Sequence, residues 1–159
     1  MQDSAVTIRL RNLVDGFDLQ NEEYASYLDR QTGEVVTIAH EETRAVERGA
    51  LLEEFPEWQR EMISLAQALL EDTSHRFLNL PDRWDFHEYG VMKEFCGSLG
   101  DTDASDVLFR AIQGKGAFRR FKDTLYQLGM IEQWYRYRDD ALKELLVRWC
   151  RANNVEIVD

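Results

Sequence analysis

The residues best suited to chemistry lie in one short basic stretch, GKGAFRRFKDTL, at positions 114–125. Cations near the first turns of a helix oppose the helix dipole, so an anion is expected to compensate them. Gly114 and Gly116 allow close backbone approach, and free amides at the helix start can help to hold a phosphate or carboxylate. The stretch therefore predicts an anion-binding site made by Lys115, Arg119, Arg120 and Lys122 together with the two glycines.

The same stretch also has a structural explanation. Carboxylates from the acidic part of the chain could fold against the cations, because charge runs usually have structural or solvated partners. The apolar residues of the stretch recur at three and four residues and are expected in the core of an amphipathic helix: Phe118, Phe121, Leu125 and Leu128. From the sequence, both explanations of the cations stay open.

A second polar cluster, PDRWDFHEYG at positions 81–90, gathers Asp82, Asp85, His87 and Glu88. These residue types suit metal binding or acid–base catalysis, but the zinc motif H-E-x-x-H needs a second histidine where this chain has Val91. Asp85 followed by Glu88 instead has the spacing of a helix cap with reciprocal backbone bonds. We therefore favour capping, and predict no catalytic residue, no metal ligand set and no cofactor.

Two further features have a structural explanation. WYRYRDD, at positions 134–140, alternates aromatics with arginines, a pattern that can stack on unpaired bases or anchor a protein, although core packing explains the aromatics as well. Cys96 and Cys150 are far apart and lack a C-x-x-C motif. We expect each cysteine to be a small buried apolar residue.

The charge is acidic and uneven. The chain has 30 acidic and 19 basic residues, a net charge of −11. Up to Asp103 there are 22 acidic and 9 basic residues, and beyond it there are 8 acidic and 10 basic residues. Because phosphate binding draws its affinity from lysine and arginine, nucleic acid is a disfavoured partner. No apolar run is long enough to span a membrane and no export signal is visible, so a cytoplasmic location is predicted.

Hydrophobic spacing predicts the elements that position these residues. A first amphipathic helix is expected around Leu10 to Phe17, followed by a β-hairpin from Tyr24 to Ala39 with Gly33 in its turn. Pro56 suits the start of a helix from Glu57 to Leu70. The buried stripe predicted for that helix consists of Trp58, Met62, Leu65, Ala66 and Leu69.

The rest of the chain is predicted to be mostly helical. Helices are expected at positions 86–99, 104–113, 117–128 and 131–152, with Gly129 ending the third of them. The terminal NVEIV could add a strand to the hairpin. The predicted fold is therefore α+β, a predominantly helical single domain over residues 1–159 with a small antiparallel hairpin sheet.

Four stretches together resemble a bacterial family: YLDRQTGEVV, FLNLPDRWDFHEYGVMKEFC, GKGAFRRFKDTL and WYRYRDDALKELLVRWC. It is the uncharacterised protein family (UPF) number one hundred and fifty-eight. The likeness runs from about Asn12 to Val158, and Gly-x-Gly-Ala-Phe-Arg-Arg-Phe is its most specific block. The resemblance implies an intracellular bacterial protein and carries no activity, cofactor or catalytic residue. Lys115 stands where the resemblance leads us to expect arginine, a change that keeps the charge but loses forked recognition of a carboxylate or phosphate.

Three functions are compatible with these patterns. The first is a non-enzymatic binding or regulatory module, whose unbalanced charge could match a protein partner or a second copy of the chain. The second is an enzyme or sensor for a phosphorylated small molecule or nucleic-acid end, gripped by the basic stretch. The third is an acidic protein that mimics DNA. We favour the first.

Overall fold

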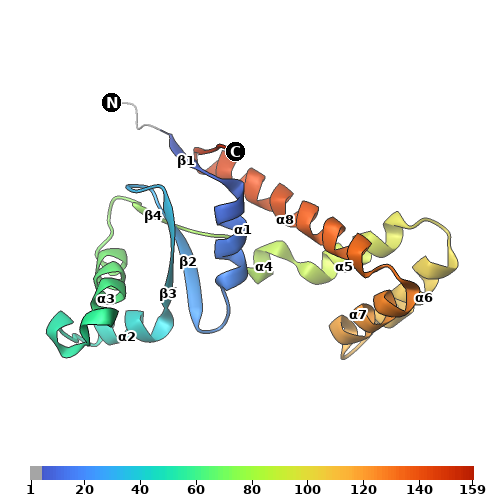
Figure 1. Cartoon of the computed structure of the whole chain (residues 1–159), viewed down its shortest axis with the longest axis horizontal. Coiled ribbons are helices and arrows are strands. Elements are labelled where there is room, and N and C mark those ends of the chain that lie inside the picture. Colours follow the sequence, from blue (N-terminus) through green and yellow to red (C-terminus); the bar gives the residue numbers. More distant parts are fainter. Residues whose placement is uncertain (1–4) are drawn as a thin grey trace. The chain divides into compact units, whose positions relative to one another are not determined.

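The computed structural model describes residues 5–159, and residues 1–4 of the predicted domain lie outside that range. The fold is α+β and mostly helical, as predicted (Figure 1). Its contacts divide the chain into two compact units. The first is the chain up to Asp82 together with Leu146–Asp159, and the second is Arg83–Leu145. That residues 1–159 form a single domain stays a prediction.

The predicted hairpin is the centre of the first unit. Strands β2 (Tyr24–Asp29) and β3 (Glu34–Ala39) pair antiparallel, with Asp29 opposite Glu34. Gly33 lies in the turn at φ +77°, a left-handed conformation that glycine adopts without strain. Strand β4 (Phe77–Asn79) pairs with the other edge of β2, so β2 is the middle strand of a three-stranded sheet.

Helix α1 (Leu10–Leu19) packs against β2 and β3 (Figure 1). It comes close because Gly16 has no side chain, and a Cβ there would lie 2.6 Å from Cγ1 of Val35. At the same point the buried hydroxyl of Ser26 donates to the carbonyl oxygen of Gly16 at 2.7 Å. The approach of helix and sheet thus depends on one glycine and one satisfied buried hydroxyl.

The terminal strand does not join the hairpin, so that part of the prediction was wrong. Strand β5 (Val155–Ile157) pairs in parallel with β1 (Val6–Ile8), and Val6 lies opposite Val155. The two form a separate two-stranded sheet. The sequence analysis had not identified β1, which left the hairpin as the only expected pairing partner.

Helix α2 (His40–Glu47) and the short 3₁₀ helix η1 (Leu52–Glu54) precede α3 (Glu57–Leu70), which has the predicted bounds and follows Pro56 at its N-cap. Helix α3 packs against α2 and also contacts η1 and β3. It buries Ile63 and Ala66.

The predicted buried stripe of α3 was therefore largely wrong. Trp58 is 81% exposed and Met62 is 37% exposed, while Leu65 and Leu69 are half-buried. The helix has apolar residues on two sides, and the side that contains Ile63 is the buried one. Trp58 consequently faces solvent.

The second unit is helical, and its bounds largely follow the predictions. Helix α6 (Asp103–Ala111) is capped by Thr102, whose hydroxyl accepts from the amide of Ser105 at 3.2 Å. Helix α7 (Ala117–Leu128) ends at Gly129, which is left-handed as expected. Helices α4 (Arg83–Phe86) and α5 (Glu88–Ser98) begin the unit, and α8 (Ile131–Ala152) runs from it into the first unit.

Three aromatic rings form the centre of this second core. Phe95, Phe121 and Trp134 contact one another edge to face, with centroid separations of 6.2, 5.5 and 4.9 Å. Each comes from a different helix, so the cluster fixes α5, α7 and α8 together. Core packing is thereby confirmed for the tryptophan of WYRYRDD.

Among the helices of residues 5–159, none combines the length and apolar character needed to cross a membrane.

Candidate functional site

The basic stretch begins in the loop between α6 and α7. Gly114 and Gly116 both have left-handed backbone angles, at φ +74° and +76°. A residue with a side chain would be strained at either position, so the two glycines allow the loop to turn tightly. This turn brings backbone carbonyl oxygens, rather than amides, towards the following helix.

Arg120 receives those carbonyl oxygens. Its Nε donates to the carbonyl of Ala111 at 3.0 Å, and its two Nη atoms donate to the carbonyls of Gln113 and Lys115. The carbonyl of Ala111 belongs to the last residue of α6, where the helix dipole is negative and a cation is favourable. Arg120 therefore caps α6 and ties its end to α7.

The other three cations of the stretch have no such role. Lys115, Arg119 and Lys122 are exposed, and within the second unit no carboxylate or carbonyl lies in ion-pair or hydrogen-bond contact with their side chains. The site predicted from the sequence thus contains two kinds of residue. Arg120 is explained by capping, and the anion-binding prediction for the other three stays a prediction.

Exposed aromatic side chains accompany these cations, and this corrects the expectation that Phe118 and Leu128 lie in the core. Phe118 is 50% exposed and Leu128 is 40% exposed, while Phe121 and Leu125 are buried as predicted. The buried side of α7 is narrower than the four-residue repeat suggested, because Phe121 alone of its two phenylalanines joins the cluster with Phe95 and Trp134 at the centre of the core. Tyr126 is 61% exposed.

Phe118, Lys122 and Tyr126 follow one another at intervals of four residues, so they line one side of α7, with Arg119 beside them. The pKa of Tyr126 is raised, chiefly by a hydrogen bond with the Tyr135 side chain of α8. We call Phe118, Arg119, Lys122 and Tyr126, together with Lys115 of the loop before the helix, the α7 face. It combines positive charge with aromatic surface, which is suited to binding an anionic partner through both charge and apolar contact.

The family of the chain is shown by a comparison with protein-family models. Residues 3–159 match the model described as "Uncharacterised protein family (UPF0158)". The chain belongs to this family. The resemblance carried by GKGAFRRFKDTL and its companion stretches is therefore confirmed.

Two UPF0158 relatives are bacterial. A UPF0158 protein of Pseudomonas aeruginosa is 28% identical over 90 residues, which are 56% of this chain and 59% of the relative. A UPF0158 protein of Chlamydia pneumoniae is 21% identical over 153 residues, which are 95% of this chain and 42% of the relative. These alignments thus span about two-fifths to three-fifths of the length of each relative. No solved structure matches the chain, and the UPF0158 description carries no activity to transfer.

The polar cluster at positions 81–90 has a structural arrangement in this UPF0158 chain. His87 has a left-handed backbone at φ +54° and breaks the helix that was predicted to run from Phe86 to Leu99. The N-cap residue of α5 is His87 rather than Asp85, so the predicted capping pair of Asp85 with Glu88 is not formed. Asp82 belongs to the first unit.

Glu88 has a different partner. Its Oε1 accepts from Nε of Arg138 at 2.7 Å, and the Arg138 guanidinium lies over the ring of Phe86, 5.3 Å from the centroid. The pair joins the start of α5 to α8 inside the second unit. One arginine of WYRYRDD is thereby explained by structure.

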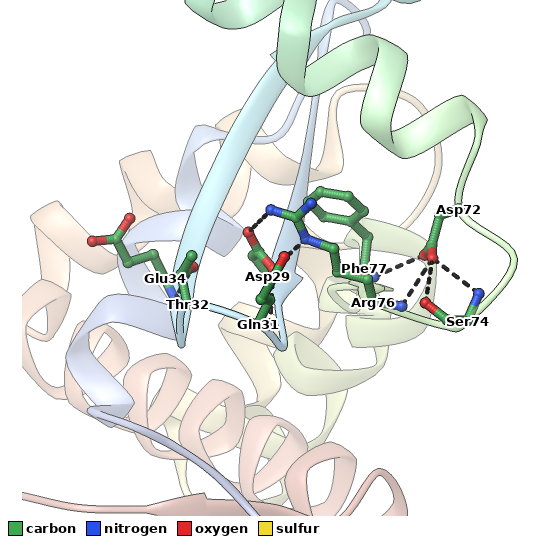
Figure 2. A network of polar contacts seen from close by, with 8 residues as sticks. All are labelled: Asp29, Gln31, Thr32, Glu34, Asp72, Ser74, Arg76 and Phe77. Carbon is green, nitrogen blue, oxygen red and sulfur yellow. Dashed lines mark hydrogen bonds and ion pairs between the residues drawn. The ribbon is translucent and has the colours of Figure 1, made fainter.

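A polar network in the first unit was missed by the sequence analysis (Figure 2). Asp29, at the end of β2, is buried and accepts two hydrogen bonds of 2.9 Å from Arg76, to its two carboxylate oxygens. The amide of Gln31 donates to Asp29 as well, at 2.9 Å. Hydrogen bonding to Arg76 lowers the pKa of Asp29.

Asp72 binds the backbone amide of Arg76. Its carboxylate accepts from the backbone amides of Ser74, Arg76 and Phe77, and these bonds lower its pKa (Figure 2). The Arg76 guanidinium also lies over the ring of Phe77. Each carboxylate oxygen of Asp29 and Asp72 accepts a hydrogen bond within the chain, so the network connects the hairpin to the turn before β4. No short motif predicts this network, because Asp29 and Arg76 are 47 positions apart.

The two cysteines are buried, as expected. Burial raises the pKa of each thiol to about 11. A thiol must ionise to act as a nucleophile, so neither side chain is suited to that role at neutral pH.

Proposed function

We propose that this UPF0158 chain is a cytoplasmic, non-enzymatic binding module that holds an acidic protein surface on its α7 face. The observation that supports this most directly is the set of exposed cations Lys115, Arg119 and Lys122. They have no carboxylate partner within their own unit and stand beside exposed Phe118 and Tyr126. Exposed aromatics next to arginine are typical of protein interfaces.

An acidic protein surface fits the α7 face better than a nucleic acid does. Nucleic-acid affinity grows with the number of phosphates neutralised, and three cations are few for a chain with a net charge of −11. A small phosphorylated ligand fits less well too, because the guanidinium of Arg120, which lies close to Gly116, is occupied by carbonyl oxygens.

The test uses three probes by fluorescence anisotropy and thermal shift: a labelled helical peptide rich in glutamate and leucine, a short oligothymidylate, and inorganic phosphate. The peptide is expected to bind the full chain. Reversing both exposed cations of α7, with Arg119→Glu and Lys122→Glu, is expected to weaken peptide binding about tenfold or more. Each attraction between a cation and a glutamate of the peptide becomes a repulsion.

The matched control is Arg11→Glu with Arg48→Glu. Both arginines are exposed in the first unit, so the pair changes the net charge equally without touching α7. This control should keep most of the peptide affinity. Equal losses in both double variants would refute a specific site. Tighter binding of the oligothymidylate, or a phosphate effect abolished by Arg119→Glu, would replace the acidic-protein proposal with a nucleic-acid or phosphate site.

A further inference from the structure

We infer that the acidic surface held by the α7 face is helix α3 of a second copy of the same chain. The inference rests on the proposed function and names its partner. It starts from the part of α3 that the fold leaves uncovered, which we call the α3 stripe: Glu57, Trp58, Glu61 and Met62.

The α3 stripe is an amphipathic face that the described residues of its own unit leave uncovered. Trp58 is the second most exposed of the large hydrophobic residues described, and Met62 lies one helical turn further on. Glu57 and Glu61 are exposed, and among residues 5–82 and 146–159 no ion pair or hydrogen bond engages their carboxylates. Trp58 and Met62 together form an apolar patch rimmed by the two carboxylates, and exposed apolar patches with a polar rim are typical of interaction surfaces.

The α3 stripe and the α7 face are complementary in charge and spacing. Glu57 and Glu61 are four residues apart on α3, and Arg119 and Lys122 are three residues apart on α7. At 1.5 Å rise per residue, these separations along each axis are about 6 Å and about 4.5 Å, so both carboxylates can meet a cation when the helices cross.

The apolar parts are complementary too. Trp58 and Met62 can cover Phe118 and Tyr126, while Arg119 is placed to stack on the indole. Tryptophan and arginine are the residues that most often dominate interface energies. The contact therefore has an apolar centre with charged residues at its edge, the usual anatomy of a specific interface.

The charge of the two units favours a second copy over an unrelated protein as the occupant. The first unit has 19 acidic and 9 basic residues, and the second has 11 acidic and 10 basic residues. Placing the first unit of one copy on the second unit of another therefore avoids the repulsion between two acidic units. Each chain carries both surfaces, so a single sequence supplies both sides of the contact.

The experiment measures the oligomeric state of the full chain by sedimentation velocity over a wide concentration range at about 0.15 M salt. Wild type is expected to associate as concentration rises. Arg119→Glu with Lys122→Glu should remain monomeric, and so should Glu57→Lys with Glu61→Lys. Trp58→Ala should weaken association roughly tenfold or more. All the altered side chains are exposed, so circular dichroism should show an unchanged fold.

The decisive step mixes the two charge-reversed chains. The first keeps an intact α3 stripe and the second keeps an intact α7 face, so the mixture should form a one-to-one complex although neither chain associates alone. The Arg11→Glu, Arg48→Glu control should associate like wild type. The inference would be overturned if the mixture stayed monomeric, or if either charge-reversed chain associated like wild type. A change in sedimentation coefficient that does not depend on concentration would also overturn it.

Failure of this inference is distinguishable from failure of the proposed function. If wild type stays monomeric while the acidic peptide still binds and loses affinity in Arg119→Glu with Lys122→Glu, then the α7 face binds another acidic protein and only the second copy is excluded. If the peptide binding is also insensitive to those substitutions, the proposed function falls as well.

Discussion

Replacing Arg120 by methionine separates the structural cation of the basic stretch from its neighbours. The substitution removes three hydrogen bonds, from the guanidinium to the carbonyls of Ala111, Gln113 and Lys115. Hydrogen bonds that involve a charged group contribute about 1.5–3 kcal/mol each when buried, but Arg120 is exposed and its carbonyls can bind water instead. We therefore expect a total loss of about 1–2 kcal/mol in the free energy of unfolding.

Arg119→Met is the matched control on the neighbouring residue of the same helix. The side chain of Arg119 makes no hydrogen bond within the second unit and stands near the positive end of the α7 dipole. Removing its charge should leave stability unchanged or raise it by a few tenths of a kcal/mol. Arg120→Lys should show most of the loss seen with methionine, because an ammonium cannot reach three separated carbonyls as the planar guanidinium does.

The assay is urea unfolding followed by circular dichroism. With a slope of about 2 kcal/mol per molar urea, Arg120→Met should lower the midpoint by roughly 0.5–1 M while Arg119→Met leaves it in place. Equal shifts for the two variants would refute the distinction between a capping arginine and a binding arginine. An unchanged midpoint for Arg120→Met would show that the carbonyl contacts contribute nothing to stability.

Three other predictions concern packing, pH and reactivity. Gly16→Ala should destabilise by about 1–2 kcal/mol in urea unfolding, because its Cβ would meet Val35 at 2.6 Å, whereas Gly97→Ala in open space should stabilise by up to about 1 kcal/mol. The pKa of Asp29 is lowered by its hydrogen bond to Arg76, so its contribution to the free energy of unfolding is present above the unfolded pKa and is lost as pH falls through the lower folded pKa. When urea unfolding is repeated below about pH 4, the free energy of unfolding should therefore fall less in Asp29→Asn than in wild type. Cys96 and Cys150, with a thiol pKa of about 11, should react with a disulfide reagent at pH 8 only after urea unfolds the chain, and fast reaction of the native protein would contradict their burial.

Local signals in the sequence were sufficient to place most elements. The hairpin follows from β-rich segments around Gly33, and the bounds of α7 follow from Gly116 and Gly129, which flank the helix. In each case the determining residues lie within a few positions of the element. The uncharacterised family was also identified from local blocks of sequence.

Which side of a helix is buried could not be predicted in the same way. Trp58 and Ile63 are both apolar residues of α3, and the elements that pack on this helix decide that Ile63 is buried and Trp58 is not. Phe118 and Phe121 likewise differ because Trp134, from another helix, covers one of them. Periodicity shows that a helix has an apolar side, but when it has two, tertiary packing selects between them.

The basic stretch shows the same limit for charge. The sequence indicated that four cations at a helix start need negative partners, and it offered carboxylates or a ligand as candidates. For Arg120 the structure supplies a third candidate, the carbonyl oxygens of a loop bent by Gly114 and Gly116. Backbone acceptors carry no mark in the sequence, because every residue has one.

The uneven charge of the chain gives the α7 face an unusual dependence on salt. At about 0.01 M salt, interactions reach roughly 30 Å, so we expect an approaching acidic partner to be repelled by the net charge of −11 as well as attracted by the α7 cations. At about 0.15 M the reach falls to roughly 8 Å, which screens the distant acidic residues while leaving charges in contact less affected. At about 1 M even contacts are weakened.

Binding of the acidic peptide, and association of the chain, should therefore be strongest at intermediate salt. A simple basic patch on a neutral or basic protein would bind an acidic partner less tightly at each increase in salt, because screening then opposes only attraction. Anisotropy titrations across this range distinguish the two cases. A steady decline in affinity from the lowest salt would mean that the carboxylates of the chain do not oppose the approach of an anion, and that the α7 face acts independently of the acidic charge around it.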